Sequence, residues 1–390
     1  MNPSTLATLT ERATFHRRAL HQMPELGLDL PRSLNYVRTA LAAAGLEPRD
    51  CGPGLTCDVG DAGPLVAIRA DLDALPVAEE TGLSFASDTP GRMHACGHDA
   101  HGGALLAAAE LLAKTPPFGY RVRLIFQPGE EGAFGAVKMI DAGCLDGVSA
   151  IVGGHVGDLS EELAPGQAGF LPGPMMAASD RFSGTFVGSG GHGSAPHQTL
   201  DPIAALAQFI QAVYAFRSRR PDQRKPFVLS VCQVSAGSAF NVIPGSAEFK
   251  GTARTLEPAE RDLARAGLEA ACSGAALACG LEGRFEWIDG YPPLANHPEA
   301  TRLSMKAAED ALGPGRVVEL TVPSMGGEDF SYYLMKVPGC FWFLNTQAPE
   351  SGITHPNHHP RFDVDERWLG SLAAVNLAAA EALALKFGRT

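Results

Sequence analysis

The order of apolar and polar residues predicts a layered α/β domain in the first part of the chain. Apolar residues recur at helical spacing over residues 6–23 and 32–44. A buried strand is expected at 64–70. The predicted elements then alternate as helix, strand, helix and strand, at 104–114, 122–126, 133–142 and from 150. Such alternation favours a mostly parallel sheet covered by helices on both faces.

The pattern changes after residue 178. The predicted order becomes strand, helix, strand, strand, helix, strand, at 181–187, 202–217, 227–234, 247–253, 258–279 and 284–288. This order is typical of a small split βαβ sandwich. A helix at 297–312, a strand at 339–344 and an Ala-rich helix at 365–386 then resume the earlier pattern. We therefore expect a discontinuous main domain, 1–177 and 294–390, with an inserted α+β domain at 178–293.

The composition of the chain argues against nucleic acid and membranes as partners. The 390 residues carry a formal charge of −12, and a nucleic-acid binder would need a basic face. No run of about 18 apolar residues indicates a membrane span, and the first twenty residues lack the apolar run of a signal peptide. The eight cysteines form no CxxC pair. We expect a cytoplasmic protein with reduced thiols and no nucleic-acid or membrane partner.

A dense polar cluster precedes the helix predicted at 104–114. It contains His94, Cys96, His98, Asp99 and His101. We expect these residues in a loop at the helix start, where free N–H groups favour anions. A thiolate would be stabilised there, and a thiolate beside an imidazole suits a borderline metal ion. The alternative is that Asp99 only caps the helix and the histidines are solvated.

Further polar residues follow predicted strands. Glu130 and Glu131 follow the strand at 122–126, His155 follows the next one, and His358 lies in a stretch too rich in His and Pro for a helix. Open α/β sheets bind ligands beyond the carboxyl ends of their strands. One Glu could bind a metal and the other act as a base, although a Glu pair is commonly solvated surface and a lone His a core residue. Together these side chains match a metal site with open positions for water.

Ten motifs along almost the whole chain carry a family resemblance. They are HRRALHQMPELG, RADLDALP, MHACGHDAH, FQPGEEG, GGH, GGHGSAPH, FNVIPG, GTARTL, MGGEDF and HHPRFDVDE. The chain resembles the M20 peptidase/amidohydrolase family, in the branch of hippurate hydrolases, auxin-conjugate hydrolases and N-acyl-diaminopimelate deacetylases. The resemblance implies a phosphorylase/hydrolase-like α/β catalytic domain over 1–177 and 294–390. It also implies a ferredoxin-like lid and dimerisation domain over 178–293.

The resemblance further implies a binuclear centre with two divalent metal ions per subunit. By motif position the ligands are Cys96, His98, Glu131, His155 and His358, whereas His359 falls outside the motif. Glu130 is the implied general base, which takes a proton from a metal-activated water and passes it to the leaving amine. Cys, His and carboxylate ligands suit Zn²⁺ or Mn²⁺, and also Co²⁺ or Ni²⁺.

In the inserted domain, the resemblance implies that His192 stabilises the tetrahedral oxyanion, often from across a dimer. Asn241 and Arg254 match positions that contact the substrate, with Arg254 as a partner for its carboxylate. From the residues alone, His192 could be a turn residue and Arg254 could form a structural salt bridge. Asp73 is not an expected metal ligand, but it is expected to contact a ligand histidine and to orient it.

The expected reaction is hydrolysis of the amide bond of N-acyl amino acids, with an acetyl, benzoyl or similar acyl group. It releases a carboxylic acid and a free amino acid, and the enzyme is expected to be a homodimer or a higher homo-oligomer. Three alternatives stay open. The same site could act on dipeptides or N-carbamoyl amino acids, Cys96 with His98 could form a thiol hydrolase, or the protein could bind metal without catalysis.

Overall fold

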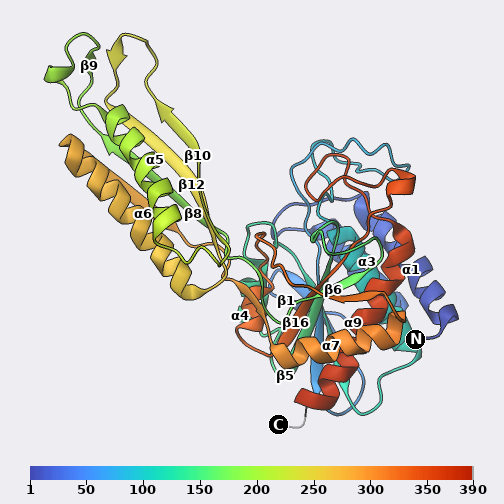
Figure 1. Ribbon diagram of the computed structural model, residues 1–390. Coiled ribbons are helices and arrows are strands. Elements are labelled where there is room, and N and C mark those ends of the chain that lie inside the picture. The colour runs from blue at the N-terminus through green and yellow to red at the C-terminus, as the bar shows by residue number, and fades with distance from the viewer. Residues whose placement is uncertain (389–390) are drawn as a thin grey trace. The chain divides into compact units, whose positions relative to one another are not determined.

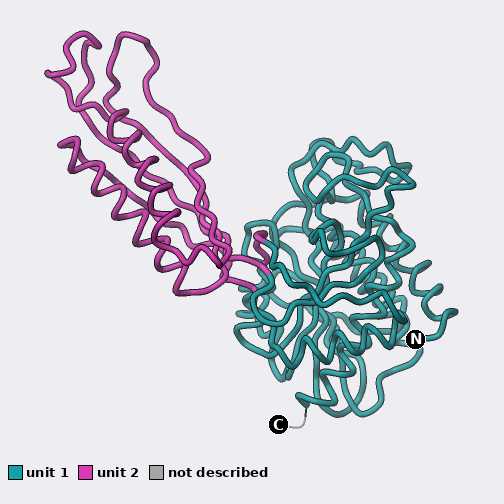
Figure 2. The backbone as a smooth tube through the Cα atoms, viewed as in Figure 1, with its two compact units in different colours: residues 1–175, 295–324, 329–390 teal, residues 176–294, 325–328 magenta. Residues whose placement is uncertain are grey.

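The computed structural model describes residues 1–388, and the chain forms two compact units. Unit 1 comprises residues 1–175, 295–324 and 329–390, and unit 2 comprises 176–294 and 325–328 (Figure 2). Residues 325–328 were expected in the main domain but pack in unit 2. The reason is local, because the Ala177 N–H donates to the carbonyl of Gly326 at 2.9 Å.

Unit 1 contains an eight-stranded sheet in the order β1-β2-β4-β3-β5-β16-β6-β15 (Figure 1). Its strands are β1 (Arg49–Cys51), β2 (Gly54–Val59), β3 (Leu65–Asp71), β4 (Arg121–Gln127), β5 (Val148–Val156), β6 (Ala168–Phe170), β15 (Val317–Glu319) and β16 (Gly339–Leu344). The four central strands β4, β3, β5 and β16 are parallel. β2 and β6 run antiparallel to their inner neighbours β4 and β16. The predicted parallel core is confirmed, whereas β1, β2, β6 and β15 were not anticipated.

The helices of unit 1 cover both faces of this sheet. They are α1 (Pro3–His21), α2 (Pro31–Ala43), α3 (His98–Lys114), α4 (Gly135–Asp141), α7 (Pro298–Leu312), α8 (Ser331–Leu334) and α9 (Leu369–Phe387), with 3₁₀ turns η2 (Pro349–Ser351) and η3 (Glu366–Trp368). α1, α3 and α9 pack on the face that buries Ile68, Leu124 and Trp342. On the other face Phe330, beside α8, packs on Phe341 with ring centroids 4.9 Å apart.

The C-terminal helix is a core element. The segment Glu366–Phe387 is long and apolar enough to cross a membrane by composition, but 72% of its most apolar window is buried inside the structure. Leu372, Val375 and Leu383 of α9 are fully buried against the sheet and its neighbouring helices. Its apolar character therefore reflects packing on all sides, as is usual for a helix inside a large core.

Helix α3 begins earlier than its sequence indicated. It starts at His98 rather than near residue 104, and Gly97 precedes it with φ of +90°. The helix continues through Gly103. A side chain would not fit there, because α3 lies so close to α1 that a Cβ would be 2.7 Å from the Arg17 backbone nitrogen. His98, Asp99 and His101 are therefore held in the first helical turn and not in a flexible loop.

Unit 2 has the element order β8 (Asp180–Val187), α5 (Pro202–Arg219), β10 (Phe227–Ala236), β12 (Ser246–Thr255), α6 (Pro258–Cys279) and β13 (Glu282–Ile288). The four strands form an antiparallel sheet in the order β10-β12-β8-β13, which is a split βαβ arrangement. Phe186, Phe209 and Phe249 pack together between this sheet and the helices. Short elements complete the chain: β7 (Gly173–Met176), β9 (Gly191–His192), η1 (Pro196–Gln198), β11 (Val242–Ile243) and β14 (Leu294–Asn296).

Candidate metal and catalytic site

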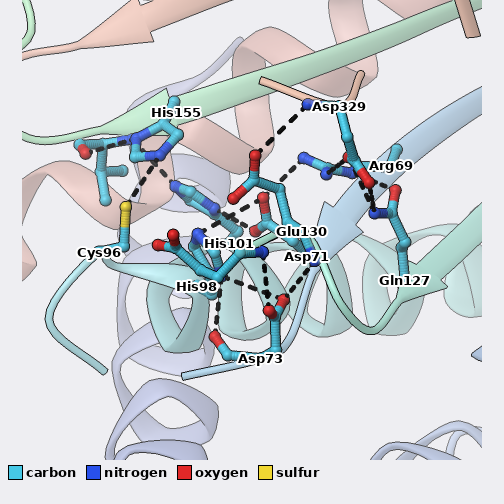
Figure 3. A network of polar contacts seen from close by, with 12 residues as sticks. Arg69, Asp71, Asp73, Cys96, His98, His101, Gln127, Glu130, His155 and Asp329 are labelled. Atoms are coloured by element: carbon cyan, nitrogen blue, oxygen red, sulfur yellow. Dashed lines mark hydrogen bonds and ion pairs between the residues drawn. The ribbon is translucent and has the colours of Figure 1, made fainter. Parts of the chain in front are cut away.

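Polar side chains gather in unit 1 where adjacent parallel strands end (Figure 3). β3 ends at Asp71, β4 ends at Gln127 just before Glu130, and His155 is the penultimate residue of β5. These strands are neighbours in the sheet, so their carboxyl ends meet at one edge. The start of α3 adds Cys96 and His98 to the same place.

The structure brings the five predicted metal ligands together. Donor atoms of Cys96, His98 and His155 lie within 4.8 Å of one another, and so do those of Cys96, Glu131 and His358. Cys96 Sγ lies 3.4 Å from His155 Nε2, and His358 Nε2 lies 3.3 Å from Glu131 Oε1. Since Cys96 belongs to both groups, the arrangement has the layout of two adjoining cation positions.

The rings of two of these histidines are fixed in the form that a metal requires. His98 Nδ1 lies 2.8 Å from the carbonyl of Asp73, and His155 Nδ1 lies 2.8 Å from the carbonyl of Val156. A carbonyl can only accept, so each Nδ1 carries a proton, and each ring when neutral has its lone pair on Nε2. His98 Nε2 is buried and has no hydrogen-bond partner within residues 1–388. A buried lone pair of this kind fits a metal ligand.

His101, in the same helical turn, has both ring nitrogens engaged. Its Nδ1 lies 2.5 Å from Asp71 Oδ1, and its Nε2 accepts a hydrogen bond from the Val156 N–H at 3.0 Å. His101 therefore ties α3 to the end of β5 and has no lone pair left for a cation.

Burial and hydrogen bonds together set the charge state of the metal-free cluster. Burial raises the pKa of the Cys96 thiol, and the neighbouring Glu131 carboxylate acts in the same direction. Without a metal ion, burial therefore opposes the thiolate that was expected at the helix start. Hydrogen bonds to Cys96 and Glu131 raise the pKa of His358 to about 10. A cluster that holds a proton in this way favours a divalent cation in place of that proton, because the cation stabilises the thiolate and the carboxylate together.

The two adjacent glutamates are held by one buried carboxylate. Asp73 accepts the Glu130 N–H on Oδ1 and the Glu131 N–H on Oδ2, each at 2.9 Å. Glu131 then extends to His358, whereas Glu130 Oε1 accepts the Asp329 N–H at 3.4 Å. The Asp73 carboxylate thus fixes the Glu130–Glu131 backbone, and it is the Asp73 carbonyl that orients His98.

A buried network behind Glu130 was not assigned any role from the sequence. Arg69 donates to Asp71 Oδ2 at 2.6 Å and to Asp329 Oδ1 at 2.8 Å, and the Gln127 side-chain amide also donates to Asp329. Burial raises the pKa of Asp329 to about 6. The network holds the backbone of Asp329, whose N–H contacts Glu130. The only sequence signal was that these residues fall within the motifs RADLDALP, FQPGEEG and MGGEDF.

The remaining predicted residues lie in unit 2. His192 is exposed on β9, and its Nδ1 accepts the Ser194 N–H at 3.1 Å, so the neutral ring carries its proton on Nε2. Arg254 lies within β12, and its side chain forms no hydrogen bond or ion pair with the part of the chain that the structure describes, so the structural salt bridge is not found. Its burial lowers the pKa of the guanidinium.

Unit 2 does not bring Arg254 together with His192 and Asn241. His192 pairs with Val242 next to Asn241, and the Gly193 N–H donates to the Asn241 carbonyl. Arg254 is at the other end of β12, which begins at Ser246 just beyond this pair. Eight residues of extended strand span roughly 25 Å. One small substrate therefore cannot touch both ends of this strand.

Comparison with known proteins agrees with this geometry. Residues 67–382 match Peptidase family M20/M25/M40. The chain is 38% identical to an N-acetyl-L-cysteine deacetylase of Bacillus subtilis, over 94% of this chain and 86% of the relative. It is 40% identical to thermostable carboxypeptidase 1 of Saccharolobus solfataricus, over 93% of both.

A solved structure extends the likeness to the whole fold. The YXEP protein of Bacillus subtilis, described as a dinuclear metal-binding peptidase of the M20 family, superposes with a TM-score of 0.82 at 34% identity, covering 98% of this chain and 99% of that one. The match to the family spans most of the chain, and the candidate ligand atoms lie close enough together to hold metal ions. The chain belongs to the M20 peptidase family and is a metal-dependent amidohydrolase.

Proposed function

We propose that the protein hydrolyses the amide bond of N-acyl amino acids, with an acetyl, benzoyl or similar acyl group. The observation that supports this most directly is the cluster of five ligand side chains, Cys96, His98, Glu131, His155 and His358, beside a separate carboxylate, Glu130. A Bacillus subtilis relative is named as a deacetylase of N-acetyl-L-cysteine, an N-acyl amino acid.

The five ligand residues would hold two divalent cations, for which Zn²⁺ and Mn²⁺ suit the mixture of thiolate, imidazole and carboxylate. When bound, the cations would polarise the amide carbonyl and bring the pKa of a water molecule to about 7. When neutral, the His98 and His155 rings would present their Nε2 lone pairs to the cations, because each Nδ1 proton is bound to a carbonyl.

Glu130 acts as the general base. It takes a proton from the attacking water and passes it to the leaving nitrogen, so that amide and water give a carboxylic acid and an amine. Its position suits this role because Asp73 holds its backbone and its side chain is not drawn to His358, unlike that of Glu131. His192 donates its Nε2 proton to the oxyanion, Asn241 contacts the substrate, and Arg254 binds the carboxylate of the amino acid.

Glu130→Gln tests this division of roles. The substitution keeps the size of the side chain but removes the base, so turnover should fall at least about 10²-fold while two metal ions remain bound. Glu131→Gln should instead lose metal. Glu161→Gln, a change at an exposed site, is the matched control. Full activity of Glu130→Gln at unchanged metal content would refute the proposal.

A dipeptide is the second candidate substrate, because a relative 40% identical is named as a carboxypeptidase. A dipeptide also presents an amide bond and a free carboxylate. Purified enzyme with defined metal should be assayed against acetyl, benzoyl, carbamoyl and peptidyl derivatives of the same amino acid. The proposal requires the highest kcat/KM for an acyl derivative, and a higher value for the peptide would transfer the assignment to a dipeptidase.

The separation of Arg254 from His192 and Asn241 supports a homodimer in which two chains complete each site. Co-expression of Arg254→Ala with His192→Ala tests this. If the residues of one site come from different chains, mixed dimers contain one intact site. Random pairing then restores about a quarter of wild-type activity, since half of the dimers are mixed. If one chain supplies both residues, every site carries a defect and activity stays at the level of the single variants.

A cytoplasmic location is also part of the proposal. All eight cysteines lie within residues 1–388 and are free thiols. Free thiols are typical of a reducing compartment. Fractionation of the native host followed by immunodetection would test this location.

A further inference from the structure

Three segments that carry proposed metal ligands meet at the side chain of Asn357. Its Nδ2 donates to the carbonyl of Cys96 at 3.1 Å and to the carbonyl of Val156 at 3.2 Å. Asn357 itself directly precedes His358 in the chain. We infer that Asn357 is a positioning residue that sets the places of Cys96, His155 and His358 relative to one another. This inference rests on the proposed function.

The Asn357 NH₂ group makes these two contacts and also lies 3.9 Å from Cys96 Sγ, whereas the buried Oδ1 has no hydrogen-bond partner within residues 1–388. A side-chain NH₂ group has two hydrogens, and each is directed at a backbone carbonyl that can only accept. The assignment of nitrogen and oxygen in this amide is therefore fixed by its neighbours. With both hydrogens engaged, Asn357 has no donor left for a substrate, so its influence on the reaction passes through the ligand segments.

One of the two carbonyls also controls a ligand ring. The oxygen of Val156 accepts the Nδ1 proton of His155 at 2.8 Å as well as the Asn357 amide. Two lone pairs allow a carbonyl to accept both. The His155 ring is then directed with Nε2 toward Cys96 Sγ at 3.4 Å. Without the Asn357 amide, the Val156 carbonyl would be held less firmly. That carbonyl binds His155 Nδ1 and so leaves His155 Nε2 to face the proposed metal position.

The backbone at the next residue is strained and needs such support. His358 has φ of +71°, and Phe134 is the other non-glycine residue of 1–388 with positive φ. This left-handed conformation is unfavourable for a residue that has a side chain. The His358 N–H donates to the carbonyl of Ala95 at 2.7 Å, which adds a second tie to the Cys96 segment. Relaxation to negative φ would move the imidazole away from Glu131.

The opposite wall of the Asn357 site is a glycine. Gly157 has φ of +133°, and a Cβ there would lie 2.1 Å from Asn357 Oδ1. Gly157 directly follows the carbonyl that the amide binds. Because Gly157 has no side chain, Asn357 can reach between the two carbonyls. A substitution at Gly157 would therefore displace the Asn357 amide while leaving residue 357 unchanged.

Asn357→Asp is the sharpest variant, because it keeps the shape while it directs a carboxylate oxygen at two carbonyl oxygens. Asn357→Ala removes the amide without adding charge, and Gly157→Ala displaces it. Asn35→Asp, the same substitution at an exposed position of α2, is the control. Each metal-free protein is titrated with Zn²⁺ alone by calorimetry. Its thermal unfolding is measured without metal, and kcat and KM are determined at limiting and saturating Zn²⁺.

The inference predicts that Zn²⁺ affinity falls about 10- to 100-fold in all three variants, the range usual for residues that orient ligands. Unfolding of the two metal-free Asn357 variants should change little, whereas Gly157→Ala should also lower Tm because its φ of +133° is strained for any residue with a side chain. Saturating Zn²⁺ should restore most of kcat with KM unchanged. Zn²⁺ affinities within twofold of wild type in Asn357→Asp and Asn357→Ala would overturn it. If Asn357→Asp does not fold, Asn357→Ala decides. Failure of wild type to bind either Zn²⁺ or Mn²⁺ would instead refute the proposed function itself.

Discussion

Arg17 of α1 is a buried cation that joins three parts of unit 1. Its Nε donates to Asp99 at 3.1 Å, its Nη2 to Asp363 at 2.5 Å and its Nη1 to Glu366 at 3.1 Å. The side chains of Arg17 and Asp99 are only 2% and 1% exposed. Asp99 also interacts with His21 Nδ1 at 2.8 Å. Arg17 thus connects the start of α3 to the segment that follows His358.

Replacement of Arg17 by Met keeps much of the apolar contact of the side chain but leaves Asp99 buried beside a single cation. Removal of one partner of a buried ion pair typically costs about 3–5 kcal/mol. The neighbouring Arg18 binds the same Glu366 from an exposed position, where an ion pair contributes about 1 kcal/mol or less. Arg18→Met is therefore the matched control, one residue away.

The assay is equilibrium unfolding in guanidinium chloride followed by tryptophan fluorescence. Trp342 is fully buried in unit 1 and reports on its core. We expect the Arg17→Met transition to lose about 3–5 kcal/mol and that of Arg18→Met to lose less than about 1 kcal/mol. Equal small losses in both variants would refute the conclusion that burial makes the Arg17 contacts strong.

A pH titration, a glycine substitution and removal of metal give three further predictions. Although burial opposes it, Asp99 and Glu79 raise the pKa of His21 to about 9, above its unfolded value of about 6.5. The resulting stability of about 3 kcal/mol is present below pH 6.5 and lost as pH rises through 9, so unfolding midpoints of wild type and His21→Gln should converge near pH 10. Gly97→Ala should lower Tm and metal content more than Gly82→Ala. The new Cβ at Gly97 would lie 2.5 Å from the Val156 side chain, whereas a Cβ at Gly82 would meet nothing within 4 Å. Equal effects would mean that the strained backbone, and not the contact with Val156, causes the loss. Dialysis against a chelator should abolish activity and Zn²⁺ or Mn²⁺ should restore it, whereas full activity after chelation, lost on alkylation of Cys96, would support a thiol hydrolase.

The motifs predicted which side chains meet, because several of them lie at the carboxyl ends of neighbouring parallel strands or at the start of α3. The structure gathers Cys96, His98, Glu131, His155 and His358 as expected, although they are spread over most of the chain. Their roles as ligands stay a prediction. The order of elements in unit 2 also followed from apolar spacing, because an antiparallel sheet covered on one face keeps an alternating pattern.

The supporting contacts could not be predicted in the same way. Asp73 and Asn357 bind backbone groups, and backbone groups leave no mark in a sequence pattern. The start of α3 was missed because its first turns are buried on every side, so no amphipathic period marks them. Residues 325–328 pack in unit 2 rather than in the main domain, where contacts such as the hydrogen bond from Ala177 to the Gly326 carbonyl leave no sequence signal.

The insertion of unit 2 has a consequence for how the protein is made on the ribosome. Four of the five proposed ligands are translated before unit 2 begins, and His358 follows roughly 200 residues after His155. At about 5–20 residues per second, that interval lasts on the order of 10–40 s. β16, which pairs with β5, and the buried α9 also arrive late. Unit 2 can therefore fold first, while the earlier half of unit 1 waits with its thiol and imidazole groups uncovered until the last part of the chain closes both the sheet and the ligand cluster.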